Sequence, residues 1–175
     1  MRASAYMLMG TLGLALAGEP CSPQQITRTV KVEEAEEGRM HWLLPKINQE
    51  VITAFEARVG ASARYTLGQY NLTQTPAELL VVIVCREAPK SEAAGFCTYR
   101  FEYSPKKMPE FNMPLGEPKV IARPDAAGIA EDIFQEFVKE TSETRLTAAE
   151  EEVTLRVANF CSKPENQMPC SGRFQ

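Results

Sequence analysis

The stretch that decides the fold is LLVVIVCREAPKSEAAGFCTYRFEY, residues 79–103. Its first part, Leu79–Cys85, is apolar in both phases of a strand, which is typical of a strand covered on both faces. Pro89 and Gly95 mark a loop after it. The last part alternates, and its apolar residues in one phase are Cys97, Tyr99, Phe101 and Tyr103. The stretch therefore predicts a β-hairpin.

The register of this hairpin follows from its apolar residues. If Cys85 lies opposite Cys97, every large apolar side chain of the second strand meets one of the first, whereas a slip of one residue separates them. Facing Cα atoms in a non-hydrogen-bonded pair lie about 4.5 Å apart, within the range of a disulfide. We therefore predict a Cys85–Cys97 disulfide, with two reduced core cysteines as the alternative.

The other three cysteines are Cys21, Cys161 and Cys170. Cys161 and Cys170 enclose a short segment, and a disulfide between them would fix the C-terminal end of the chain. Cys21 is then the odd cysteine, which is either free or links two chains into a dimer. It could instead take Cys161 or Cys170, so the pairing stays open here.

Residues 1–17, MRASAYMLMGTLGLALA, have the order of a cleavable signal peptide. Arg2 supplies a positive start, an apolar run follows, and Ala15 and Ala17 form a small-x-small cleavage pattern. The run is too short to span a membrane, which takes about 20 residues. We expect a mature domain of residues 18–175 without a transmembrane span, in a secreted or periplasmic location where disulfides form.

Helices are expected on both sides of the hairpin in the sequence. Apolar residues recur at helical spacing from Met40 to Val59, and Pro45 is placed in the first turn. Asp125 is a candidate cap for a helix that ends near Thr141. Thr147–Glu150 has the form of a capping box and predicts a last helix to about Phe160. The alternation in this last segment leaves a strand as the alternative.

The expected fold class is α+β, as a single domain. Short strands are predicted from Ile26 to Val32, from Arg64 to Leu72 and from Lys119 to Arg123, in addition to the hairpin. The predicted order is β-α-β-β-β-β-α-α. Hairpin-length connections favour a mainly antiparallel sheet of about four to five strands, with the helices packed on one face.

Composition excludes some function classes. The net charge of −4 and the scattered basic residues lack the basic stripe that phosphate contacts need, so we expect no nucleic-acid partner. The single histidine, His41, and the absence of Cys-x-x-Cys argue against a metal site or a redox site, and no cofactor motif is present. We expect no cofactor, and no catalytic residue can be assigned.

The segment Ser104–Pro118, SPKKMPEFNMPLGEP, is the candidate binding loop. Its four prolines bar a helix or a central strand. Its apolar residues either pack onto the sheet or stay exposed for protein contacts. The residues assigned to this loop are Lys106, Lys107, Met108, Phe111, Met113 and Leu115.

Taken together, these patterns predict an exported, non-catalytic domain that binds a protein or a cell-envelope component. The alternative is an exported hydrolase that uses a pair of carboxylates brought together by the fold. A concave pocket with two Asp or Glu carboxyl groups about 5–10 Å apart would favour the hydrolase, whereas a flat or filled surface would exclude it.

Overall fold

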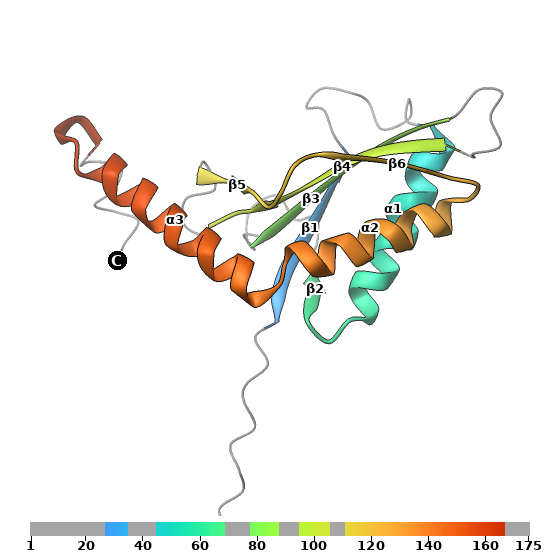
Figure 1. The fold of residues 1–175 in the computed structure, drawn as a ribbon, viewed down its shortest axis with the longest axis horizontal. Coiled ribbons are helices and arrows are strands. Elements are labelled where there is room, and N and C mark those ends of the chain that lie inside the picture. Colours follow the sequence, from blue (N-terminus) through green and yellow to red (C-terminus); the bar gives the residue numbers. More distant parts are fainter. Residues whose placement is uncertain (1–26, 35–44, 69–77, 88–94, 106–110, 167–175) are drawn as a thin grey trace, which may run out of the picture.

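The computed structural model describes residues 27–34, 45–68, 78–87, 95–105 and 111–166 of the 175-residue chain. These residues form an α+β fold in which a six-stranded mixed sheet carries helices on one face (Figure 1). The strands are β1 (Arg28–Glu34), β2 (Tyr65–Leu67), β3 (Leu79–Glu87), β4 (Gly95–Tyr103), β5 (Met113–Pro114) and β6 (Lys119–Arg123). The helices are α1 (Lys46–Ala61), α2 (Ala126–Glu140) and α3 (Glu143–Cys161), and a short 3-10 helix follows at Pro164–Asn166.

The sheet has the strand order β2-β1-β3-β4, and both β5 and β6 pair with the far edge of β4. The pairs that involve β4 are antiparallel, as predicted, but β1 runs parallel to both β2 and β3. The expectation of a mainly antiparallel sheet is therefore corrected to a mixed sheet. Helix α1 accounts for the β1–β2 pair, because a helical crossover returns the chain to its starting edge and the next strand then runs parallel.

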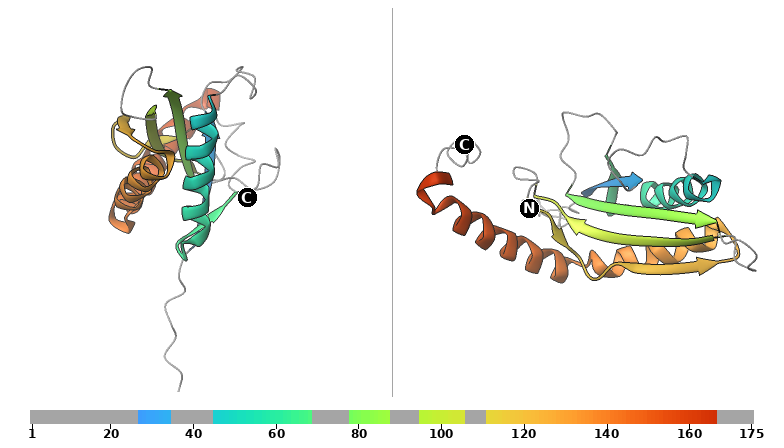
Figure 2. Two further views of the ribbon diagram at one scale, coloured as in Figure 1. Left: turned by 90° about the vertical axis from the view of Figure 1, so that its right-hand side faces the viewer. Right: turned by 90° about the horizontal axis from the view of Figure 1, so that it is seen from above.

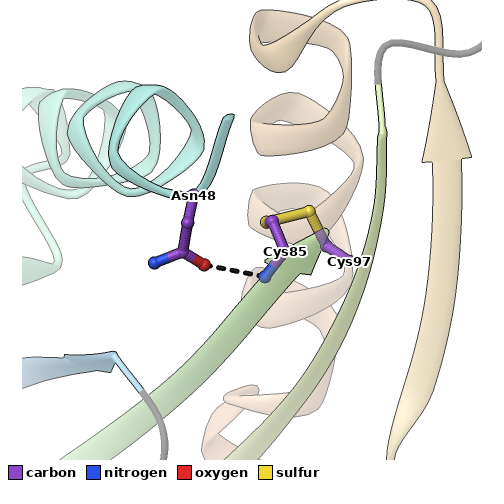
Figure 3. The surroundings of a disulfide bond; sticks show 3 residues. All are labelled: Asn48, Cys85 and Cys97. Carbon is purple, nitrogen blue, oxygen red and sulfur yellow. Dashed lines mark hydrogen bonds between the residues drawn. A yellow bond between two sulfur atoms is a disulfide. The ribbon is translucent and has the colours of Figure 1, made fainter. Parts of the chain in front are cut away.

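The predicted hairpin register is confirmed. In the structure, Cys85 lies opposite Cys97, Ile83 opposite Tyr99 and Val81 opposite Phe101. Cys85 and Cys97 form a disulfide whose Cα atoms are 4.0 Å apart (Figure 3). The described pairing of β3 with β1 ends at Ile83. Beyond this point, the amide of Cys85 donates a hydrogen bond to Asn48 Oδ1 of α1 at 2.7 Å. The helix thus satisfies a buried backbone donor that no strand of the described residues reaches.

Helices α1 and α2 cover one face of the sheet and pack against each other (Figure 2). Phe137 of α2 lies at the centre of this core, fully buried, between Phe55 of α1 and Phe101 of β4. Its ring centroid is 4.9 Å from that of Tyr65 and 5.4 Å from that of Phe101. The apolar side chains that recur with helical and with strand spacing in the sequence therefore pack together in one core.

The ends of the first two helices follow local signals. Pro45 occupies the N-cap position of α1, one residue before the predicted first turn, where its missing N–H costs no hydrogen bond. Asp125 caps α2 as predicted, since its carboxylate accepts from the amide of Gly128 at 2.7 Å.

Helix α3 differs from its prediction at its start. The segment is helical rather than extended, but the helix begins at Glu143 with Ser142 as N-cap, so the capping box at Thr147 is wrong. Leu146 is 1% exposed and belongs to the main core, so tertiary packing fixes the first turn upstream of Thr147.

Only the first part of α3 joins the core beside the sheet. Figure 1 shows the helix continuing away from the sheet, past β5. There Val153 and Val157 form a second, smaller apolar cluster with Tyr103, Phe111, Met113 and Phe160. The two C-terminal helices therefore differ in role, because α2 covers the sheet and α3 extends beyond it.

Candidate functional site

The face of the sheet opposite the helices carries a mixed set of side chains. In the register of β3, β4 and β6, the side chains on this face lie in rows, Arg86–Phe96–Ala122 and Val84–Thr98–Val120. The adjoining row pairs Val82 with Arg100, but Val82 is 3% exposed, so the exposed part of this face consists of the two rows nearest the end of the hairpin. None of the three helices packs here. Their core residues contact the alternate side chains of the strands, such as Ile83 of β3 and Phe101 of β4, which point to the other face. We call this surface the open face.

Two large apolar residues are exposed on the open face. Phe96 is 37% exposed and Val120 is 70% exposed. They are diagonal neighbours on β4 and β6, since Phe96 faces Ala122 and Thr98 faces Val120, and diagonal neighbours lie within reach of an aromatic side chain. Among the described residues the only other large apolar side chain in this exposure class is Leu155 of α3. Phe96 and Val120 thus form an apolar patch rather than isolated residues.

The predicted binding loop is only partly within the described residues. Lys106, Lys107 and Met108 lie outside them. Phe111 and Met113 are half-buried against α3, with the Phe111 ring 5.3 Å from Phe160, and Leu115 is 6% exposed in the main core. The described part of the loop therefore folds back onto the protein, and Met113 even pairs with Tyr103 as part of edge strand β5.

The cysteines other than the hairpin pair are less completely placed. Cys161 at the end of α3 is disulfide-bonded. Its two candidate partners, Cys21 and Cys170, lie outside the described residues, as does the predicted signal peptide of residues 1–17. The prediction that Cys21 is the odd cysteine, and could link two chains, therefore stays a prediction.

Comparison with known proteins gives no relative from which a site could be transferred. The chain matches no family model, no curated protein and no solved structure. In the described part of the chain, no helix is both long and apolar enough to cross a membrane. Nor do these residues contain a group of three or more His, Cys, Asp or Glu side chains that could hold a metal ion.

A close pair of carboxylates occurs on the helix side of the sheet, at the end of α2. Lys119 of β6 forms ion pairs with Glu136 and Glu140, and its Nζ is 3.7 Å from Glu140 Oε1. Arg145 of α3 also forms an ion pair with Glu140. The Glu140 side chain is buried beneath Gly116, whose φ of +90° suits glycine and whose added Cβ would come within 3.1 Å of the Glu140 carboxylate.

The electrostatics of this cluster are those of a structural ion-pair network. The pKa of Glu136 is lowered, chiefly because Lys119 donates a hydrogen bond to its carboxylate, with a further contribution from Lys139. A carboxyl group that serves as a general acid near neutral pH requires a raised pKa instead. The lowered pKa of Glu136 therefore does not fit the general acid that the hydrolase hypothesis requires.

The lowered pKa of Glu136 predicts a pH-dependent contribution to stability. Above the ordinary carboxyl pKa of 4.5 the ion pair is complete, and its contribution is lost as the pH falls through the lowered native pKa. At pH 7 we expect Glu136→Gln to lower the free energy of unfolding by about 1 kcal/mol or less, because Lys119 is partly solvated. Towards pH 3 the difference from the wild type should shrink.

Urea unfolding at pH 7, 5 and 3 measures this difference. Glu117→Gln is the matched control, since Glu117 is exposed and has no described ion pair. If the difference between the wild type and Glu136→Gln grew towards acid pH, the assignment of the ion pair would be wrong.

Sequence reasoning did not single out the open face. Phe96 precedes the alternating run and falls in its polar phase, and this is the signal that could have marked it as an outward-facing aromatic residue. Val120 belongs to a short apolar strand whose two phases cannot be told apart without knowing which face the helices cover. We therefore add the edge of the sheet as a candidate surface beside the proline-rich loop, whose Lys106, Lys107 and Met108 lie outside the described residues.

Proposed function

We propose that this chain is an exported, non-catalytic domain that binds another protein through the open face. The observation that carries the proposal is the patch formed by Phe96 and Val120, which are exposed together at the edge of a sheet whose other face is filled. Exposed apolar patches are costly in water, and on soluble proteins they commonly mark protein contacts.

Two further observations support the proposal. The buried Cys85–Cys97 disulfide agrees with the signal-like sequence of residues 1–17, because structural disulfides persist in oxidising compartments. Phe96 is also placed on a rigid element, since β4 is paired on both sides, with β3 and with β5 and β6, and is covalently joined to β3. A surface held in this way loses little conformational entropy on binding.

Site-specific photocrosslinking in the native host tests the proposal. A benzoylphenylalanine placed at Phe96 should give a defined adduct with one protein, whereas the same probe at the exposed Leu155 of α3 should not. Mass spectrometry should identify the partner and should find the chain in the adduct to begin at Gly18. With the purified partner, Phe96→Glu should weaken binding about 30-fold, which corresponds to the 2 kcal/mol of an interface hot spot.

Three outcomes would contradict the proposal. Equal adducts from positions 96 and 155 would mean that the patch is not a specific contact. An unchanged dissociation constant for Phe96→Glu would exclude the patch from the interface. Adducts that retain residues 1–17 and have a reduced Cys85 would place the protein in a reducing compartment rather than outside it.

A further inference from the structure

The direction of the backbone groups along β6 can be derived from the disulfide. A Cα–Cα distance of 4.0 Å between Cys85 and Cys97 belongs to a non-hydrogen-bonded pair of an antiparallel ladder. The amide and carbonyl of Cys97 therefore point away from β3, toward β6. Two hydrogen bonds agree with this phase. The amide of Cys85 turns to Asn48 rather than to β4, and the carbonyl of Phe101, two pairs further along, accepts from Leu115 on the outer side of β4.

The same alternation continues into β6. Because Cys97 faces Ile121, these two residues exchange hydrogen bonds, and so do the pairs two residues away on either side. The intervening residues, Val120 and Ala122, must then direct their amide and carbonyl groups away from β4. In the described part of the chain β6 pairs with β4 alone, and neither Val120 nor Ala122 has any other hydrogen bond.

This outer edge of β6 is a template for one more strand. Figure 2 shows β6 at the margin of the sheet, with α2 lying along the face that the helices cover. Both residues with outward-facing backbone groups are exposed, so that an incoming strand could reach them. Unpaired donors and acceptors on an exposed edge are the groups that bind an extended peptide by strand addition.

The side chains of β6 define what such a strand should carry. On the open face an added strand would lie beside Val120 and Ala122, near Phe96, which favours apolar residues. On the helix face it would lie beside Lys119 and Arg123. Both are ion-paired within the chain, but their side chains are 38% and 54% exposed, so acidic residues of an added strand could share these cations. The basic groups on this face are Lys119, Arg123, Lys139 and Arg145. They form ion pairs with the acidic groups Asp132, Glu136 and Glu140. Since side chains alternate between faces, the complementary segment alternates apolar and acidic residues.

A second copy of this chain fits the edge less well. If two β6 strands paired antiparallel about Ile121, Lys119 of one copy would lie opposite Arg123 of the other, at both ends of the pairing. Like charges directly opposite each other destabilise a sheet. In this register, which pairs all five residues of β6, the edge is therefore better matched to a segment of a different protein.

We propose that the outer edge of β6 takes up an extended segment of a partner protein, alternating apolar and acidic residues, as an additional strand of the sheet. This inference rests on the proposed function, and it specifies how the open-face patch engages its partner. The backbone groups of Val120 and Ala122 provide affinity, and the side chains of Val120 and Phe96 on one face and of Lys119 and Arg123 on the other provide specificity.

The test uses a phage-displayed library of random 12-residue peptides, selected on the full, oxidised chain. Peptides that bind should alternate apolar and acidic residues, and the synthetic form of the best clone should bind Ala122→Pro at least tenfold more weakly. This substitution deletes an amide that β4 does not use, and proline is tolerated on the outer side of an edge strand. Ala122→Ser, which keeps the amide, should bind like the wild type, and thermal unfolding should show that both variants are folded.

Hydrogen exchange on the peptide complex gives a second readout that does not depend on any substitution. The amides of Val120 and Ala122 should exchange quickly in the free chain and at least tenfold more slowly in the complex. The amide of Ile121, already bonded to β4, should change much less. Equal protection of Ile121 and its neighbours would overturn strand addition.

The outcomes separate the inference from the function on which it rests. If Phe96→Glu abolishes peptide binding while Ala122→Pro leaves it unchanged, the patch binds protein but no strand is added, and the inference is wrong. If no peptide is enriched on the wild type over Ala122→Pro, the inference is likewise overturned, while the photocrosslink from Phe96 still decides the proposed function. If Phe96→Glu and Ala122→Pro both lose peptide binding while Leu155→Glu keeps it, the result supports the proposed function and strand addition together.

Discussion

Phe137→Ala is expected to lower the free energy of unfolding by about 3–5 kcal/mol, the largest effect of any single substitution considered. Phe137 is fully buried, and its ring lies within 5.7 Å of the rings of Phe55, Tyr65 and Phe101. These three residues come from α1, β2 and β4. Removing the ring therefore opens a cavity between the two covering helices and the sheet. The surrounding side chains are closely packed and cannot move in to fill it.

Denaturant unfolding of the oxidised chain measures this loss. Leu155→Ala is the control, since Leu155 is 65% exposed and its truncation should change stability by about 0.5 kcal/mol or less. If Phe137→Ala cost no more than this control, Phe137 would not occupy the centre of the core, and the packing of α2 on the sheet would have to be revised.

The second large effect is expected from the disulfide of the central hairpin. Cys85 and Cys97 are separated by 12 residues, and closing a loop of this length stabilises the folded state by about 3 kcal/mol in the chain-entropy description. The double variant Cys85→Ala/Cys97→Ala should lose about this amount. Both residues are 1% exposed or less, so small cavities add to the loss.

Unfolding of the double variant should be compared with that of the wild type, with and without a reductant. Reductant should lower the stability of the wild type, because it opens Cys85–Cys97 when the chain unfolds, and should change the double variant less. Since Cys161 is also disulfide-bonded, a Cys161→Ala variant is needed to separate the two contributions. A double variant as stable as the wild type would mean that the hairpin holds its register by packing alone.

The hairpin has a direct bearing on the proposed binding surface. The disulfide fixes the pairing of β3 with β4, and β4 in turn fixes the phase of β6. A slip of one residue would turn Phe96 into the core and point the amides of Val120 and Ala122 inward. Stability of the hairpin and accessibility of the β6 edge are therefore expected to change together in register-disrupting variants.

The candidate site was less predictable than the hairpin. Which residues of a short strand such as β6 face solvent depends on where the helices pack, and this is a long-range property. The composition of the proline-rich loop suits protein contacts, yet Leu115 lies in the core and Phe111 packs on α3. Composition marks residues that must bury apolar surface somewhere, but it does not determine whether they bury it within the chain or against a partner.

The parts of this protein that depend on local or nearby residues can be predicted from the amino-acid sequence. The pairing of Cys85 with Cys97 followed from a period of two, the helical segments of α1 and α2 from a period near 3.6, and the cap at Asp125 from its side chain. The tertiary structure alone decided the parallel pairing of β1, the start of α3 at Glu143 and the exposure of Phe96 and Val120. These features arise from contacts between residues far apart in the chain, whose energies outweigh local preference and leave no periodic mark in the sequence.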